Sequence, residues 1–158
     1  MSKRKNSNKL GYDENALKLG EKFFNKCTTP MEMFFYLMKH KRVHTLTVLM
    51  IHSSMHNLED FIKSSKRVTD LLIPIDKNCG LYTLMCQETR ISGGCDFAKR
   101  LIELLKKEGE EDESVVSVVT VENYKYPIED VLFSIYDNYI KTTKGLEPNQ
   151  KICFHSIR

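Results

Sequence analysis

The residue pair best suited to bind a small molecule is Arg67 and Asp70, in the segment Arg67-Val68-Thr69-Asp70. The guanidinium of an arginine can bind a phosphate, or a planar pair of acceptors, through two parallel hydrogen bonds. A carboxylate three residues away can accept hydrogen bonds from a ligand. It can also pair with the arginine and close a turn between a helix and a strand. The sequence leaves both interpretations open.

Four histidines lie close together in the sequence, at His40, His44, His52 and His56. Histidine is a common zinc ligand, so a metal site must be considered. His52 and His56 flank the end of an expected strand, and His40 and His44 flank a basic loop. Side chains so placed need not converge. We therefore predict ordinary surface or strand-end histidines and no metal site.

The five cysteines form no CxxC or CxxH pair, so the sequence predicts no zinc finger. Cys79 lies in an expected turn and is the one cysteine considered as a nucleophile, but no histidine is placed beside it. We predict that Cys86, Cys95 and Cys153 are small buried apolar residues. Ser92-Gly93-Gly94 precedes an expected helix, and capping of that helix is favoured there over anion binding.

Composition limits the classes of protein that this chain can represent. Its 158 residues fit one domain, and with 41% hydrophobic and 28% charged residues it is neither disordered nor fibrous. No apolar run approaches the roughly 20 residues that span a membrane, and no signal peptide follows the basic start. We therefore expect a cytoplasmic protein with reduced cysteines. The net charge of +3 is concentrated near the N-terminus, so we expect no nucleic-acid partner.

The elements that must position these residues follow from hydrophobic periodicity. Residues 1–12 are predicted to be a disordered basic N-terminus. Residues 13–42 are predicted to form a helical pair, with Pro30 at the first position of the second helix. Residues 43–158 are predicted to form the main domain. Its expected strands are Thr45–His52, Leu71–Ile75, Leu81–Gln87, Val115–Val121 and Lys151–His155, and its expected helices begin near Asn57, Ser92 and Pro127.

The order of these elements predicts an α/β or α+β fold. Five strands form a central sheet that contains an antiparallel hairpin, Leu71–Gln87, and helices flank the sheet. Thr45–His52 has little polar alternation, as is typical of a central strand covered on both faces. Pro74 indicates an edge position for the first strand of the hairpin. The pattern is palm-like, as in ferredoxin-like domains.

From Thr45 onward the chain resembles a GGDEF domain, the diguanylate cyclase fold, in degenerate form. The family's helix AD-x-ALY-x-AK and the GRN segment after it match Tyr136–Lys144 and Gly145–Asn149, with Asp137, Lys144 and Asn149 in phase. Arg67-Val68-Thr69-Asp70 matches the family's R-x-x-D, and the helix ending in Ala98-Lys99-Arg100-Leu101 matches the helix after its hairpin.

The resemblance implies no cyclase activity for this chain. Active members hold metal ions on carboxylates at the end of the first strand and in the hairpin turn. Here the first strand ends in His52-Ser53-Ser54, and the signature turn becomes Asn78-Cys79-Gly80-Leu81-Tyr82. Asp76 lies near the turn as a single carboxylate. We therefore expect no catalytic residue, no metal and no cofactor.

In the family, R-x-x-D is a secondary site for cyclic di-GMP, so the resemblance implies a ligand at Arg67 and Asp70. The segment from Asp70 to the turn is longer than in the family. The function expected is a signalling module that acts by binding cyclic di-GMP, a protein partner or a second copy as a homodimer. The alternatives are a nucleotide-processing enzyme with other active-site residues, or a structural interaction subunit without a ligand.

Overall fold

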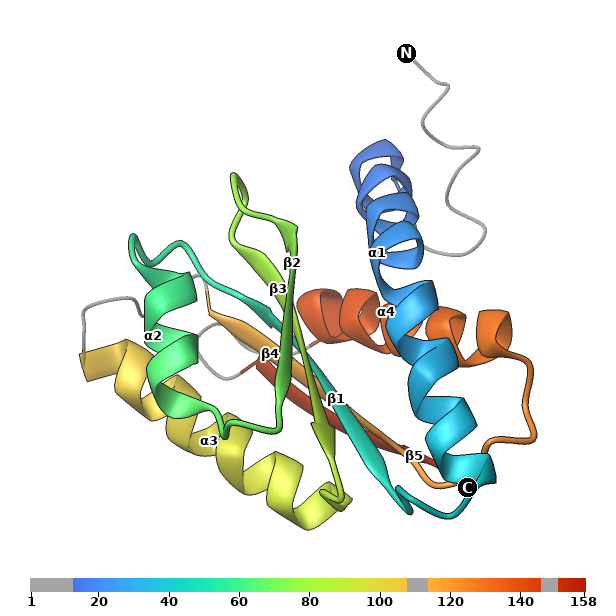
Figure 1. Ribbon diagram of the computed structural model, residues 1–158. Helices are drawn as coiled ribbons and strands as arrows, with labels where there is room; N and C mark the ends of the chain where they lie inside the picture. The colour runs from blue at the N-terminus through green and yellow to red at the C-terminus, as the bar shows by residue number, and fades with distance from the viewer. Residues whose placement is uncertain (1–12, 108–113, 146–150) are drawn as a thin grey trace.

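The computed structural model describes residues 13–107, 114–145 and 151–158. The predicted N-terminal segment 1–12, most of the acidic loop, and Asn149 lie outside this part. The described elements are α1 Glu14–Lys39, β1 Leu46–His52, α2 Leu58–Ser65, β2 Leu71–Asp76, β3 Leu81–Gln87, α3 Ile91–Lys107, β4 Val115–Val121, α4 Ile128–Gly145 and β5 Lys151–Ile157 (Figure 1).

The five strands form one mixed sheet in the order β2-β3-β1-β4-β5. β1 lies at its centre and pairs antiparallel with β3 and with β4, while β4 pairs parallel with β5. β2 and β3 form the predicted hairpin, and β2 is an edge strand, as Pro74 indicated. The predicted α+β class with a five-stranded sheet is confirmed.

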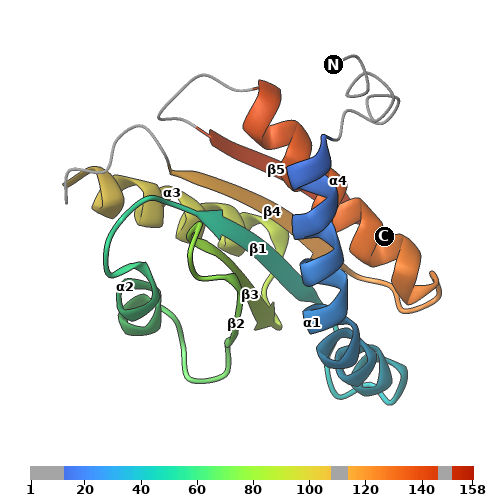
Figure 2. The ribbon, with the colours of Figure 1, turned by 90° about the horizontal axis from the view of Figure 1, so that it is seen from above.

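Helices cover both faces of the sheet (Figure 2). α1 and α4 pack on one face, and α2 and α3 pack on the other. The alternation of side chains along each strand divides the core accordingly. In β1, Val48 and Met50 face α1 and α4, whereas Leu49 and Ile51 face α2 and α3. This explains why the strand is apolar throughout.

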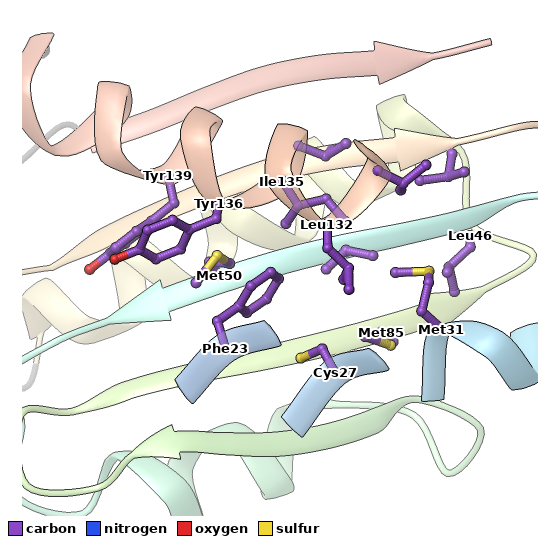
Figure 3. Packing of buried hydrophobic residues seen from close by; sticks show 14 of the residues in the cluster. Phe23, Cys27, Met31, Leu46, Met50, Met85, Leu132, Ile135, Tyr136 and Tyr139 are labelled. Carbon is purple, nitrogen blue, oxygen red and sulfur yellow. The ribbon is translucent and has the colours of Figure 1, made fainter. Parts of the chain in front are cut away.

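The larger core cluster joins α1 and α4 to the sheet (Figure 3). The ring of Phe23 stacks on that of Tyr136, with 5.8 Å between centroids. The hydroxyl of Tyr136 donates a hydrogen bond to the backbone carbonyl of Ala16. α1 is therefore packed on the same core as the sheet.

The predicted helical pair over residues 13–42 is wrong, because the structure has one continuous helix there. Pro30 lies inside α1 instead of opening a second helix. Proline removes one backbone hydrogen bond from a helix interior. The apolar face nevertheless continues across it, with Cys27 and Met31 fully buried on either side. Burial along this whole face favours a single helix over the break that the local signal predicted.

α3 begins at Ile91, one residue earlier than predicted, so Gly93 and Gly94 lie in its first turn. A Cβ on Gly94 would lie 2.6 Å from the Cγ2 atom of Thr47 and 3.0 Å from a methyl of Val118. Gly94 therefore allows α3 to lie directly on the sheet, a role distinct from the predicted capping. Within the described ranges, no helix has the length and apolar character needed to cross a membrane.

Candidate functional site

Arg67 and Asp70 meet at the corner between α2 and β2. The Asp70 carboxylate accepts hydrogen bonds from the backbone N–H, the Nε atom and the Nη2 atom of Arg67, at 2.9, 3.0 and 2.7 Å. Nη2 also lies 3.0 Å from the carbonyl of Gln87 and 2.7 Å from the hydroxyl of Thr89. The pair thus closes the turn and joins it to the end of β3.

The two side chains differ in exposure. The Asp70 side chain is 5% exposed, whereas that of Arg67 is 53% exposed. The hydrogen bond to Asp70 is the main cause that raises the pKa of Arg67, so the guanidinium stays charged. The hydrogen bonds of the Arg67 guanidinium to Asp70, Gln87 and Thr89 use Nε and Nη2, and half of the side chain remains exposed to a ligand. Asp70 is placed to orient Arg67, because Arg67 already occupies its oxygens.

A cavity of about 380 Å³ opens beside this corner, between the end of α2, the end of β3 and the start of α3. This volume lies within the range of small-molecule sites. Three arginines line it, together with two carboxylates and the first turn of α3. The lining charged residues are Arg67, Arg90, Arg100, Asp70 and Glu88. Both carboxylates have cationic or potentially cationic partners, Arg67 for Asp70 and His44 for Glu88.

Arg100 and Phe97 form the α3 wall of this cavity. The guanidinium carbon of Arg100 lies 5.5 Å from the centroid of the Phe97 ring. Such an arrangement offers a cation and a flat apolar surface to a ligand. Sequence reasoning did not identify Phe97, Arg90 or Arg100 as site residues. Arg100 lies in Ala98–Leu101, the segment that resembles the family's helix after the hairpin, and this resemblance could have indicated it as a site residue.

Cys86 also lines the cavity, and it is 5% exposed, as predicted for a buried cysteine. Burial is the largest cause that raises its pKa, to about 12, and the nearby Asp70 carboxylate adds to the rise. The thiol is therefore protonated at neutral pH and is a poor nucleophile. Cys95 is half-buried, which is less than predicted.

The turn end of the hairpin has a different construction. Ser53, at the end of β1, is buried, and its backbone N–H donates to the carbonyl of Gly80 at 3.1 Å. Gly80 has a φ of +77°, and a Cβ there would lie 2.1 Å from the Ser53 carbonyl oxygen. The Ser53 hydroxyl accepts from the hydroxyl of Ser114 at 3.2 Å. Ser53 and Gly80 thus stand at positions where the resemblance places metal-binding carboxylates, and neither residue supplies a carboxylate.

Asp76 is the carboxylate nearest this turn, and it is ion-paired. Its Oδ2 lies 2.7 Å from the Nζ of Lys22 on α1, and its Oδ1 accepts from the backbone N–H of Cys79 at 3.1 Å. The hydrogen bond from Lys22 is the main cause that lowers the pKa of Asp76. Partial burial and then the charge of Asp76 raise the pKa of Cys79, which opposes thiolate formation.

The four histidines do not converge. His44 precedes β1 and lies 3.2 Å from Glu88, while His40 packs on Tyr36 with 4.3 Å between ring centroids. His52 lies at the other end of β1, about 20 Å away for a strand of this length. In residues 13–107, 114–145 and 151–158, no three His, Cys, Asp or Glu side chains are grouped so as to hold a metal ion.

The sequence matches no protein-family model, and no curated protein is significantly similar to it. The functional argument therefore depends on the residues of the site itself.

Proposed function

We propose that this chain is a GGDEF-like binding module without cyclase activity, and that it binds cyclic di-GMP in the cavity beside Arg67. The observation that supports this most directly is the arginine-lined cavity, in which Asp70 orients a half-exposed Arg67. An anionic ligand suits this cavity, because arginines outnumber carboxylates in its lining and each carboxylate is paired. A pre-oriented guanidinium loses little conformational freedom on binding, which favours affinity.

The chemistry of the cavity suits both parts of a guanine nucleotide. Arg67 can donate from its Nη1 edge to a phosphate or to the O6/N7 edge of guanine. Arg90 and Arg100 add positive charge for phosphate, and the Phe97 ring offers a surface on which a base can stack. In this proposal Asp70 is a positioning residue, and Arg67 is the residue that touches the ligand.

The absence of cyclase activity is proposed from the turn end of the hairpin. Phosphoryl transfer between nucleotides requires metal ions held by carboxylates. The resemblance places these carboxylates at the end of β1 and in the hairpin turn, where this chain has Ser53 and Gly80, which contact each other through the backbone. The nearby carboxylate of Asp76 forms an ion pair with Lys22. Incubation with GTP and Mg²⁺ should therefore give no cyclic di-GMP by chromatography, and measurable product would overturn this part of the proposal.

The proposed setting is the cytoplasm. The cysteines whose side chains the structure describes are free thiols, which suits a reducing compartment. In this setting, ligand binding would change the affinity of the module for a protein partner or for a second copy. Reciprocity requires that the partner change the affinity for the ligand by the same factor.

The decisive experiment is thermal unfolding with and without cyclic di-GMP. A ligand present at 100 times its dissociation constant stabilises the folded state by about 2.7 kcal/mol, which raises the midpoint by roughly 5–10 °C in a domain of this size. Arg67→Ala should abolish the rise. The matched control is Arg42→Ala, which removes the same charge from the exposed loop between α1 and β1 and should keep the rise.

GTP, AMP and inorganic phosphate serve as comparison ligands in the same assay. A shift with cyclic di-GMP alone supports the proposal. Equal shifts with every phosphate compound indicate nonspecific anion binding and contradict it. If no compound shifts the unfolding midpoint, the ligand proposal fails, and the role of Arg67 and Asp70 is to close the turn between α2 and β2.

A further inference from the structure

The two edges of the sheet differ in their ability to accept another strand. At the β2 edge, Pro74 lacks an N–H, the register shifts between Pro74 and Asp76, and Lys26 Nζ donates to the carbonyl of Ile75 at 3.2 Å. At the opposite edge, β5 pairs with β4 in unbroken register (Figure 2). β5 contains no proline, and its single charged residue is its first, so it lacks the features that usually block edge pairing.

The backbone direction of β5 identifies which groups face its open edge. The carbonyl of Ile157 accepts from the N–H of Glu122 at 2.9 Å, so the polar backbone groups of Ile157 face β4. These directions alternate along a regular strand. Ile152, Phe154 and Ser156 therefore direct their N–H and C=O groups away from β4, and this set is symmetric about Phe154.

We propose that β5 pairs antiparallel with β5 of a second copy, around a two-fold axis at Phe154. In this register Phe154 faces its own equivalent, and Ile152 faces Ser156. Each outward N–H then meets an outward C=O, so the edge is fully paired and one sheet continues across both copies. A slip by one residue would place outward groups opposite inward groups and lose these bonds. A two-fold contact of this kind closes and does not propagate.

Side chains and charges agree with this register. Phe154 is 42% exposed although it is apolar, and Lys99 Nζ lies 6.0 Å from its ring centroid. In a hydrogen-bonded antiparallel pair, facing Cα atoms are about 5.5 Å apart, so the two Phe154 rings would cover each other. Lys151 is placed opposite Ile157, so no like charges face each other along the paired strands. A self-complementary edge favours a second copy over an unrelated peptide.

The test is the molar mass of the full chain by light scattering over a concentration series. Wild type should form a dimer that dissociates on dilution. Ser156→Pro removes an outward N–H that β4 does not use, and it should weaken the dimer at least tenfold. Ser156→Ala keeps the N–H and should dimerise like wild type. A wild type that is monomeric at every concentration, or a Ser156→Pro variant that dimerises equally well, overturns the proposal.

A second variant covers the case in which Ser156→Pro does not fold, as judged by circular dichroism. Phe154→Lys places two like charges opposite each other and should be monomeric, whereas Phe154→Tyr should still dimerise; a dimeric Phe154→Lys variant contradicts the proposal. The edge inference is independent of the nucleotide proposal, because the cavity lies at the α2 and α3 corner. A monomeric variant should still show the shift with cyclic di-GMP, so either proposal can fail while the other stands.

Discussion

The two ends of the β2–β3 hairpin are built in contrasting ways. At the turn end, the Ser53 and Gly80 backbones are in direct contact, and Asp76 is paired with Lys22. At the opposite end, the corner of Arg67 and Asp70 borders a cavity of about 380 Å³. The turn end also borders a cavity, of about 370 Å³, but the charged residues that line it are Lys18, Lys22 and Asp76. Both ends of the hairpin therefore border a cavity, and they differ in the charged groups that line it.

The difference follows from the groups available at each end. At the turn end, a glycine at positive φ permits close approach of the Ser53 backbone, so no side chain fits between the two residues. Long arginine side chains at the other end keep their charged groups in water, so a space remains between them. Binding of an anionic ligand is consequently expected at the corner of Arg67 and Asp70, where three arginines line the cavity. Four experiments test this contrast, from the largest expected effect to the smallest.

Gly80→Ala should have the largest effect. The new Cβ would lie 2.1 Å from the Ser53 carbonyl oxygen, at a φ of +77° that alanine rarely adopts. We expect a loss of at least about 3 kcal/mol in the free energy of unfolding, measured by denaturant titration. Gly145→Ala is the control, because nothing lies within 4 Å of its Cβ position, and it should be nearly neutral. Equal midpoints for the two variants would show that the turn end is not closely packed.

Asp70→Ala should have the next largest effect on stability. It removes a 5% exposed carboxylate that accepts three hydrogen bonds from Arg67. We expect a loss of about 2 kcal/mol in denaturant titration. Asp60→Ala, on the exposed face of α2, should change stability by no more than about 0.5 kcal/mol. If the two variants are indistinguishable, Asp70 does not hold the corner.

Arg100→Ala should affect binding more than folding. Arg100 is exposed and lines the cavity over the Phe97 ring. Loss of one charged donor to a phosphate should weaken cyclic di-GMP binding about tenfold, measured by calorimetry, with little change in unfolding midpoint. Lys106→Ala, near the far end of α3, serves as the control. Unchanged affinity for Arg100→Ala would limit the site to the Arg67 corner.

Asp76→Asn should have the smallest effect, and that effect should depend on pH. The hydrogen bond from Lys22 is the main cause that lowers the pKa of Asp76 below its ordinary value in the folded protein. Its contribution to stability is therefore present above about pH 4 and is lost as the pH falls through the lowered value. Denaturant midpoints of wild type and variant should differ slightly at pH 7 and converge as the pH falls through the lowered pKa of Asp76. A constant difference would mean that the charge is not responsible.

Much of the fold could be predicted from local patterns. The apolar run of β1 predicted a central strand, and Pro74 correctly indicated an edge. The prediction of a second helix beginning at Pro30 was wrong, because burial of the apolar face along all of α1 outweighed the local preference of proline for a helix start. The backbone preference of a proline acts on one turn of helix, whereas the free energy of burying apolar side chains accumulates along the whole helix.

The candidate site could be predicted only in part. Arg67 and Asp70 are three residues apart, so their pairing was one of the two interpretations that the sequence offered. Arg90 and Arg100 join them through the packing of α3 against the ends of α2 and β3. The contact of Arg67 with Thr89 spans 22 residues, and no local spacing encodes it.

The sequence by itself determined the strand and helix periods, the hairpin, and a turn without paired carboxylates, because these depend on residue type and near neighbours. The tertiary structure alone decided that the Ser53 and Gly80 backbones are in contact, that three arginines share a cavity, and that β5 is an edge strand of the described sheet. These properties depend on which distant surfaces pack together, since space left between elements is a property of their arrangement and not of any one segment.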